Sequence, residues 1–554
     1  MKHFSNKSVL ALSLCALTAA TLASCHKTVE DSEQVLEVFC AKLGYGSDWC
    51  DQLLKAFEQE DWVKEKYPNL QVIFETSADR SSIGTRIQAG EGRNTVDLVF
   101  SDGLSGMIGV DNNGNECSEN LTDTVYNTQV PGESIKVIDK MNPYYRNAVK
   151  YYQYGESSFD QSLPFKAYDF YWATGMMGIV YNVNLLQKFG YDHEPRTSEE
   201  FAEACAKITA DSSADYGKKY AIMWAGSADY AQYFYNIWWG QYEGYDNYLN
   251  YWNGVSYDGD DYTEKSSDIF KQVGRLEAVD TMINVFSNAN GYRYASGAAT
   301  DFKAAQRYFT RGEGVFMFNG DWLYNESKEQ FDFSPYTFRM MKSPIISSII
   351  NKTPTIKSET ELRDVIAKID EGKKTAAEAG LDAVSEEDYQ RILQARSVTY
   401  ALGPGCSTFI PNYAKGKGIA CDFLRFMATD KAQVIYGQAT GGASLPFTYD
   451  IKKNNPDVYQ TFSDLEKSRY EMFNESVHGS TVLPYGDNYP LSKFGGLKEW
   501  TTFALNGTIM QYVAAGTATG STSAQAAFDR DIEYWTNNNS QKWFDCLRLA
   551  GYNS

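Results

Sequence analysis

The chain has 554 residues, of which 43% are hydrophobic, and a formal net charge of −20 at pH 7. Single hydrophobic cores rarely grow beyond about 250 to 300 residues, so a chain of this length is expected to form two lobes. Phosphate backbones and anionic headgroups repel so acidic a surface, which argues against nucleic acid as a partner.

The N-terminus has the pattern of a lipoprotein signal peptide. Lys2 and Lys7 precede an apolar run, residues 9–23, which is too short to span a bilayer as a finished helix. The run leads into Leu-Ala-Ser-Cys, and small residues before a cysteine suit the cleavage site of lipoprotein signal peptidase. An uncleaved transmembrane anchor is the alternative interpretation of the same run.

This pattern predicts how the chain is processed and where it lies. We expect residues 1–24 to be removed, and Cys25 to become a lipidated first residue with palmitate among its acyl chains. Residues 25–34 are then a linker. No later segment approaches about eighteen uninterrupted apolar residues, so the mature chain is expected outside the cytoplasm, soluble and anchored to a membrane by its lipid alone.

The cysteines and histidines argue against a metal centre. Apart from Cys15 and Cys25 the cysteines are scattered, and we expect mostly buried thiols; a disulfide framework is the alternative. Histidines are few, and neither an HExxH motif nor a paired CxxC motif occurs, so we predict no metal and no cofactor. The cysteines concerned are Cys40, Cys50, Cys117, Cys205, Cys406, Cys421 and Cys546.

Strands and helices alternate at the start of the mature chain. Residues 35–40 predict a buried strand, 49–65 an amphipathic helix, 70–75 a strand, 83–89 a helix and 95–100 a third strand. This order and spacing are typical of βαβ units and of a parallel sheet. Ligands of such sheets bind at the carboxyl ends of the strands.

Two candidate ligand contacts follow from this sheet. Tyr45 lies in the loop after the first strand and Asp102 directly after the third, which places both on one rim. Residues 111–116 alternate oxygen ligands as a calcium loop does. The glycine is misplaced and no glutamate stands at the twelfth position, so a hairpin tip is favoured over a calcium site.

Later elements continue the α/β pattern. Residues 177–181 predict a short buried strand, and Thr197 forms a capping box with Glu200, which predicts the start of a helix. A sheet-like run at 408–411 is followed by a helix at 420–429. These elements indicate a second α/β unit beyond the first sheet.

Residues 342–396 differ in composition from the rest of the chain. They lack its aromatic density and carry two helical stretches, near residues 359–372 and 385–395. We interpret them as an inserted helical flap.

Three stretches share the motif order of a known family. Residues 178–191 read GIVYNVNLLQKFGY, residues 312–322 read GEGVFMFNGDW, and residues 420–429 read ACDFLRFMAT. Together they resemble the family 1 extracellular solute-binding proteins of bacterial carbohydrate ABC importers. The similarity covers most of residues 35–345 and 400–450.

The resemblance implies an α/β fold of the periplasmic-binding-protein type (type II), with discontinuous lobes joined by a hinge and with a helical insertion. Residues 35–175 and 400–448 would form one lobe, and residues 176–399 and 449–554 the other. The ligand would lie in the cleft, and hinge closure would be coupled to docking on an importer permease. The protein would act as a monomer that carries a carbohydrate, most simply an oligosaccharide.

The resemblance also implies candidate site residues. Trp322 matches a tryptophan that commonly stacks on a sugar ring in the family, and Asp321 stands where the family usually has proline. Trp172 is expected at the edge of the cleft. Packing beside the hinge is the alternative role for Trp322.

Residues 220–262 are dense in aromatic side chains. A sugar site needs flat aromatic rings for the C–H faces and polar side chains for the hydroxyls. Tyrosine and tryptophan are enriched where one edge is apolar and the other wet, so Trp224 and Trp238 are further candidates. An aromatic core beneath a helix is the alternative.

Two other functions share some of these features. A surface glycan-binding lipoprotein of the helical SusD-like type would have the same lipid anchor, acidity and aromatic content. A secreted glycosidase or lyase would need two carboxylates roughly 5 to 10 Å apart. No nucleophile elbow, phosphate loop or metal motif supports catalysis, so we do not expect an enzyme.

Overall fold

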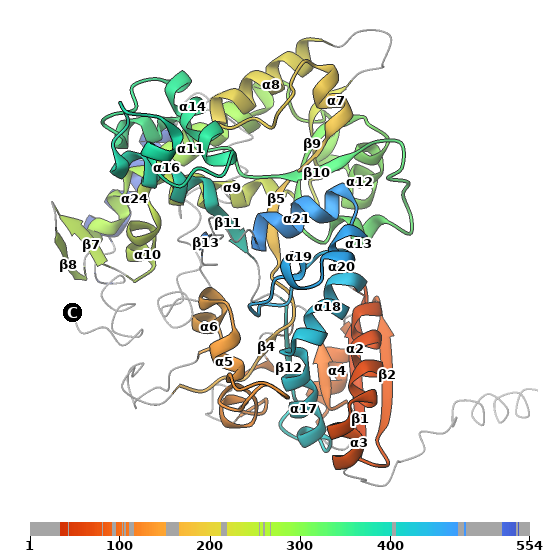
Figure 1. The fold of residues 1–554 in the computed structure, drawn as a ribbon. Helices are drawn as coiled ribbons and strands as arrows, with labels where there is room; N and C mark the ends of the chain where they lie inside the picture. Colours follow the sequence, from red (N-terminus) through yellow and green to blue (C-terminus); the bar gives the residue numbers. More distant parts are fainter. Residues whose placement is uncertain are drawn as a thin grey trace, which may run out of the picture.

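The computed structural model describes residues 34–538 and Gln541, with gaps inside that span. Figure 1 shows two lobes, one above the other, joined by strands; α21 (Asp464–Asn474) packs on the upper lobe. The predicted signal peptide, Cys25 and the linker up to residue 33 lie outside the described residues. The gaps are residues 43, 80, 91–95, 102–103, 105–106, 110–115, 151–164, 212–218, 254, 259–260, 266, 402–405, 475–480, 484–522 and 539–540.

The lower lobe is built on a five-stranded sheet of order β2-β1-β3-β12-β4. The predicted βαβ pattern is confirmed, because β1 pairs in parallel with both β2 and β3. β12 lies between β3 and β4 and is antiparallel to both. The strands are β1 (Val35–Ala41), β2 (Gln71–Ser77), β3 (Leu98–Phe100), β4 (Phe170–Tyr171) and β12 (Ser407–Phe409).

The first predicted helix is divided in two. The sequence predicts one helix over residues 49–65, but the chain is extended at Glu60, with ψ 132°. Trp49, Leu53 and Phe57 are buried against the sheet, which accounts for the amphipathic pattern. The helices of this lobe are α2 (Asp48–Gln59), α3 (Asp61–Lys66), α4 (Ser81–Gln88), α5 (Val137–Lys140), α6 (Pro143–Ala148), α17 (Lys417–Met427) and α18 (Asp430–Ala439).

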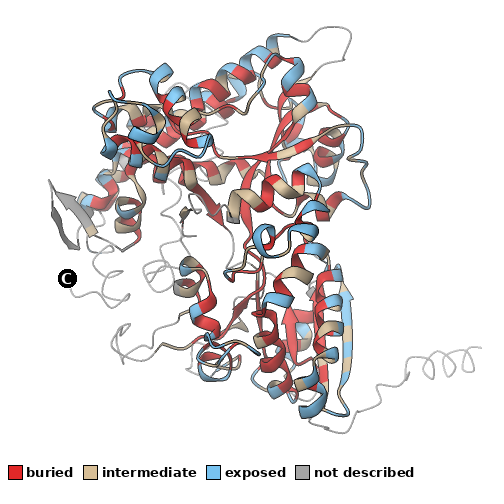
Figure 2. Cartoon of the chain, viewed as in Figure 1, coloured by how far each residue is buried: buried red, intermediate tan, exposed pale blue. Residues whose placement is uncertain are grey.

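The upper lobe is built on a six-stranded sheet in which β5 and β9 are central and buried at every residue. Strands buried on both faces read as continuous apolar runs, as these two do. Figure 2 shows them as the buried centre of the lobe. The strands are β5 (Met176–Asn182), β6 (Tyr220–Met223), β9 (Gly314–Gly320), β10 (Phe338–Met341), β11 (Val398–Ala401) and β13 (Thr481–Leu483).

Helices cover this sheet, and their sequence signals are visible. Thr197 caps α8, because its hydroxyl accepts a hydrogen bond from the Glu200 amide at 3.1 Å, which confirms the predicted cap. α9 is buried at every residue. The helices are α7 (Val183–Lys188), α8 (Ser198–Ala210), α9 (Phe234–Glu243), α10 (Tyr245–Asn253), α11 (Val273–Phe286), α12 (Phe302–Thr310), α13 (Leu323–Ser327) and α24 (Ala524–Glu533); a small hairpin, β7 (Val255–Asp258) and β8 (Asp261–Lys265), lies at the edge. Two short helices, α19 (Ile451–Asn454) and α20 (Pro456–Gln460), lie where the chain passes from α18 to α21.

The two predicted helices of the inserted segment are confirmed as α14 (Glu359–Asp370) and α16 (Glu386–Ser397), with the short α15 (Ala376–Ala379) between them. The interpretation as a flap is wrong, because these helices belong to the main core of the upper lobe. Arg396 pairs with both carboxylate oxygens of Asp370, at 3.1 and 2.9 Å. The buried core side chains of the segment are Leu362, Val365, Ile366, Ile369, Tyr389 and Ile392.

The chain crosses between the lobes after β4, again between β11 and β12, and a third time between α18 and α21. This course fits discontinuous lobes joined by crossing strands. The boundaries given above, at residues 175, 400 and 448, stay a prediction.

The predicted buried thiols are present. Cys40, Cys50, Cys205 and Cys421 are buried free thiols, and burial raises the pKa of the Cys205 thiol well above its usual value. Cys117 and Cys406 are half-buried, and Cys546 lies outside the described residues.

Candidate functional site

A row of aromatic rings runs from the lower lobe along the facing edge of the upper lobe. We call Tyr45, Trp322, Tyr230, Tyr233 and Tyr400 the aromatic row. The centroids of successive rings are 6.2, 5.7, 6.4 and 5.4 Å apart. Trp322, Tyr230 and Tyr233 are half-buried, whereas Tyr45 and Tyr400 are buried. Half-buried rings of this kind offer an apolar face together with a polar edge.

The position of Trp322 follows from its neighbours in the chain. It lies two residues after the end of β9 and caps α13, and its ring packs against the main cores of both lobes. Gly44 lies so close that a Cβ atom there would be 2.7 Å from the ring, so only glycine permits this contact. Trp322 therefore stands at the junction of the two lobes.

Replacing Gly44 by alanine is expected to displace the Trp322 ring and to weaken ligand binding at least several-fold, because a Cβ contact under 3 Å cannot be kept. Calorimetric affinity measures the effect. Gly418→Ala is the matched control, since the nearest atom to its new Cβ is the Tyr67 hydroxyl at 3.9 Å. Equal affinities of both variants and the parent would contradict the expected role of Gly44.

A buried polar group supports the row from behind. The Tyr45 hydroxyl donates to the Asp321 carboxylate, so a residue of the lower lobe is joined to one at the end of β9. Arg469 of α21 donates to the backbone oxygen of Asp321, and also to that of Thr440 at 2.6 Å. Thr174, in the crossing segment, lies 3.4 Å from the same carboxylate. These bonds join both lobes beside the crossing strands.

Burial dominates the electrostatics of this group. It raises the pKa of Asp321 to about 6, although the nearby Arg469 guanidinium acts in the opposite direction. Burial also raises the pKa of the Tyr45 hydroxyl well above its usual value and lowers that of Arg469. The Asp321 carboxylate and the Arg469 guanidinium are therefore both held away from water.

Trp172 lies directly behind the row. It is buried in the core of the lower lobe, where its ring stacks on Trp49 at 4.9 Å and meets Tyr45 edge-on at 5.7 Å. Trp238 lies apart from the row, in the core of the upper lobe. Its indole nitrogen donates to the Pro344 oxygen at 3.1 Å.

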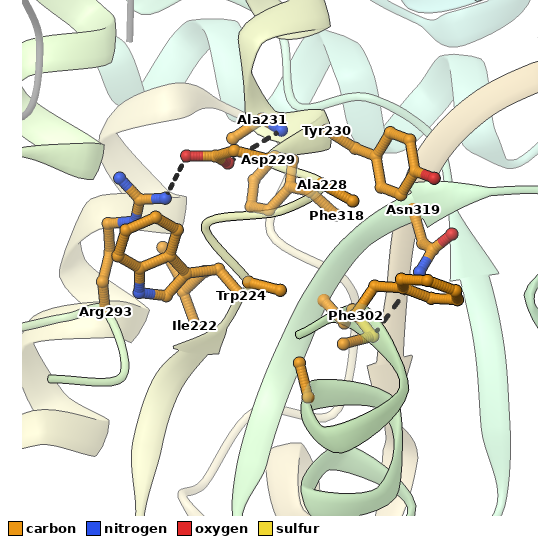
Figure 3. A pocket seen from close by; sticks show the side chains of 13 residues that line it. Ile222, Trp224, Ala228, Asp229, Tyr230, Ala231, Arg293, Phe302, Phe318 and Asn319 are labelled. Atoms are coloured by element: carbon orange, nitrogen blue, oxygen red, sulfur yellow. Dashed lines mark hydrogen bonds and ion pairs between the residues drawn. The ribbon is translucent and has the colours of Figure 1, made fainter. Parts of the chain in front are cut away.

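Trp224 is half-buried and lines a small cavity behind Tyr230, shown in Figure 3. Its indole nitrogen donates to the Tyr294 oxygen at 2.8 Å. Asp102, the other candidate of the lower rim, lies outside the described residues.

Tyr230, Tyr233 and Tyr400 belong to the row but are not among the site residues predicted from the sequence. Tyr233 stands three residues after Tyr230 in a 3-10 helix, Tyr230–Tyr233, that Asp229 caps. An aspartate before a short tyrosine repeat could have indicated that helix. Tyr400 lies in β11 near the second crossing, which no local pattern distinguishes from other core tyrosines.

No helix long and apolar enough to cross a membrane occurs among the described residues. The same part of the chain holds no cluster of three or more His, Cys, Asp or Glu side chains that could ligate a metal ion. Residues 111–115 of the proposed hairpin tip lie outside it.

Comparison by sequence finds neither a matching family model nor a matching curated protein. Comparison by structure finds apo RafE of Streptococcus pneumoniae, with a TM-score of 0.50 at 16% identity, covering 92% of this chain and 98% of that one. Maltose-bound MalE3 of T. maritima gives 0.50 at 13% identity over 90% and 98% of the two chains. The solute-binding protein RafE in complex with raffinose gives 0.49 at 14% identity over 91% and 99%.

The similarities to apo RafE and MalE3, together with the two sheets and the crossing strands, define the class of fold. The chain has the two-lobed α/β fold of periplasmic binding proteins, as the sequence predicts.

Proposed function

We propose that this protein is an extracytoplasmic solute-binding lipoprotein of the family 1 type, which captures an oligosaccharide between its lobes and delivers it to an ABC importer. The observation that carries the proposal is the aromatic row, whose half-buried rings lie where the two lobes meet. The half-buried rings, those of Trp322, Tyr230 and Tyr233, suit the C–H faces of sugars. MalE3, a neighbour of the same fold, has maltose bound.

In this proposal Trp322 stacks on one sugar ring. The Tyr230 ring, at 74° to Trp322, and the Tyr233 ring, at 23° to Tyr230, contact the next part of the sugar. Tyr45 and Asp321 hold the Trp322 region in place through the bond between the lobes. Asp102 and Trp224 stay candidate contacts. The row belongs to a mixed α/β fold with two sheets, which does not fit the helical SusD-like alternative.

A thermal-shift screen over mono- and oligosaccharides tests the function. A sugar that binds only the folded state, at a concentration of a hundred times its Kd, stabilises that state by about 2.7 kcal/mol. The same sugar should reduce the X-ray scattering radius as the cleft closes. A panel without any stabilising sugar would refute the proposal, and hydrolysed products in the incubated samples would favour the glycosidase or lyase.

The lipid anchor is part of the proposal and has its own test. Cys25→Ser should abolish acylation and release the protein from membranes, because the acylated sulfur is lost and a chain with a net charge of −20 is repelled by anionic headgroups. Fractionation after high-salt and carbonate washes measures this. A variant that still sediments with membranes would show that the anchor is assigned wrongly.

A further inference from the structure

A buried ion pair lies beside Tyr230, the middle ring of the aromatic row. Arg293 and Asp229 form it, and their side chains are 4% and 16% exposed. Figure 3 shows the Arg293 guanidinium beside the Trp224 ring and the Asp229 carboxylate turned toward it. The guanidinium carbon lies 3.4 Å from the centroid of the Trp224 ring, which is a close cation–π contact.

Asp229 connects this pair to the row. One carboxylate oxygen accepts a hydrogen bond from the Ala231 amide at 3.3 Å and so caps the 3-10 helix Tyr230–Tyr233. The other oxygen accepts from Arg293. A helix of a single turn has few hydrogen bonds of its own, so its cap contributes much of its order.

Arg293 is in turn fixed to the end of β6. Ile222 and Arg293 form a parallel β-bridge. The Ile222 amide donates a hydrogen bond to the Tyr292 oxygen at 2.9 Å, and the Tyr294 amide donates one to the Ile222 oxygen at 2.8 Å. The connection therefore runs from the central sheet through Arg293 and Asp229 to Tyr230 and Tyr233.

The pair is a poor candidate for direct contact with a ligand. The cavity beside it has a volume of about 10 Å³, which is room for one water molecule at most. A contribution to the stability of the fold does not explain the ion pair either. Burial raises the pKa of Asp229 and lowers that of Arg293, so it works against both charges. Buried ion pairs are often no more stabilising than apolar side chains of similar volume.

We propose that Arg293 and Asp229 are positioning residues of the carbohydrate site, which hold Tyr230 and Tyr233 at the angle that the bound sugar requires. This inference rests on the proposed function for its effect on affinity. Its structural half, the order of the 3-10 helix, can be measured without a ligand.

Arg293→Met removes the charge and keeps an unbranched side chain, and Asp229→Asn keeps a cap oxygen while it removes the carboxylate. Either variant should speed amide hydrogen exchange in residues 231–234 about tenfold, with exchange in α8 unchanged. Arg275→Met is the matched control, since it disrupts a buried arginine–aspartate pair elsewhere in the same lobe.

Affinity provides the second measurement, with raffinose and maltose as the first probes and the strongest sugar of the panel after them. Arg293→Met should weaken binding about tenfold, which corresponds to about 1.4 kcal/mol. In a Tyr230→Ala/Tyr233→Ala background the same change should cost less than twofold, because the tyrosines transmit the effect.

Three outcomes separate the possibilities. Unchanged exchange at residues 231–234 overturns the inference, whether or not a sugar binds. An equal loss of affinity with and without the tyrosines overturns it too, because Arg293 would then act directly or through the whole fold. Faster exchange confined to the helix in a protein that binds no sugar shows that the pair orders the 3-10 helix, but it refutes the proposed function and with it the role in a carbohydrate site.

Discussion

Trp322→Ala is expected to lower the affinity for the bound sugar about fiftyfold. One sugar face covers about 100 Å² of the ring, and about 25 cal/mol per Å² gives roughly 2.5 kcal/mol. At about 1.4 kcal/mol for each factor of ten, this is the stated loss. Isothermal titration calorimetry with the strongest sugar of the panel measures it.

The same variant should also melt at a lower temperature, because Trp322 packs against the cores of both lobes. Trp62→Ala is the matched control. Trp62 is a half-buried tryptophan that packs on Phe57, at 5.7 Å, on the outer side of the lower lobe. The Trp62→Ala variant should be less stable than the parent and bind the sugar with the parental affinity. A Trp322→Ala protein with parental affinity would remove Trp322 from the site.

Asp321→Asn is expected to change how stability depends on pH. Burial raises the pKa of Asp321 to about 6 in the folded protein, against about 3.9 in the unfolded chain. The folded state therefore binds the proton more tightly. The contribution of this group to the free energy of unfolding is fully present below pH 4 and is lost as pH rises to 6, by roughly 3 kcal/mol.

Asparagine cannot titrate, and its side-chain oxygen can still accept the Tyr45 hydroxyl. The stability of the variant relative to the parent should therefore increase between pH 4 and pH 7. Urea unfolding of both proteins across this range measures the difference. Parallel curves would mean that Asp321 is hydrated in the folded protein.

Local sequence patterns predicted the helices and strands better than they predicted where those elements pack. The strands of the first βαβ units, the Thr197 cap and the helices α14 and α16 are all signalled within short windows of sequence. The break between α2 and α3 at Glu60 has no such local signal, because both helices keep the same apolar face. Whether α14 and α16 formed a flap or a core depended on α9, which lies more than a hundred residues earlier.

The site was harder to predict for a related reason. Aromatic side chains fill residues 220–252 so densely that no helical face stands out, and α9 proves to be buried on every side. Periodicity therefore cannot separate Trp238, which lies in the core, from Tyr230 and Tyr233, which lie in the row. Trp322 could be singled out because a family motif, rather than its spacing, drew attention to it.

The place of β12 in the lower sheet affects how the chain can fold as it is made. β3 pairs with β12 on the side away from β1, and the Thr408 hydroxyl donates to the Val99 oxygen across 309 residues. Until the ribosome has added that strand, β3 exposes an unpaired edge, and contacts so distant in sequence form slowly. Most of the chain must therefore be synthesised before the lower lobe can close.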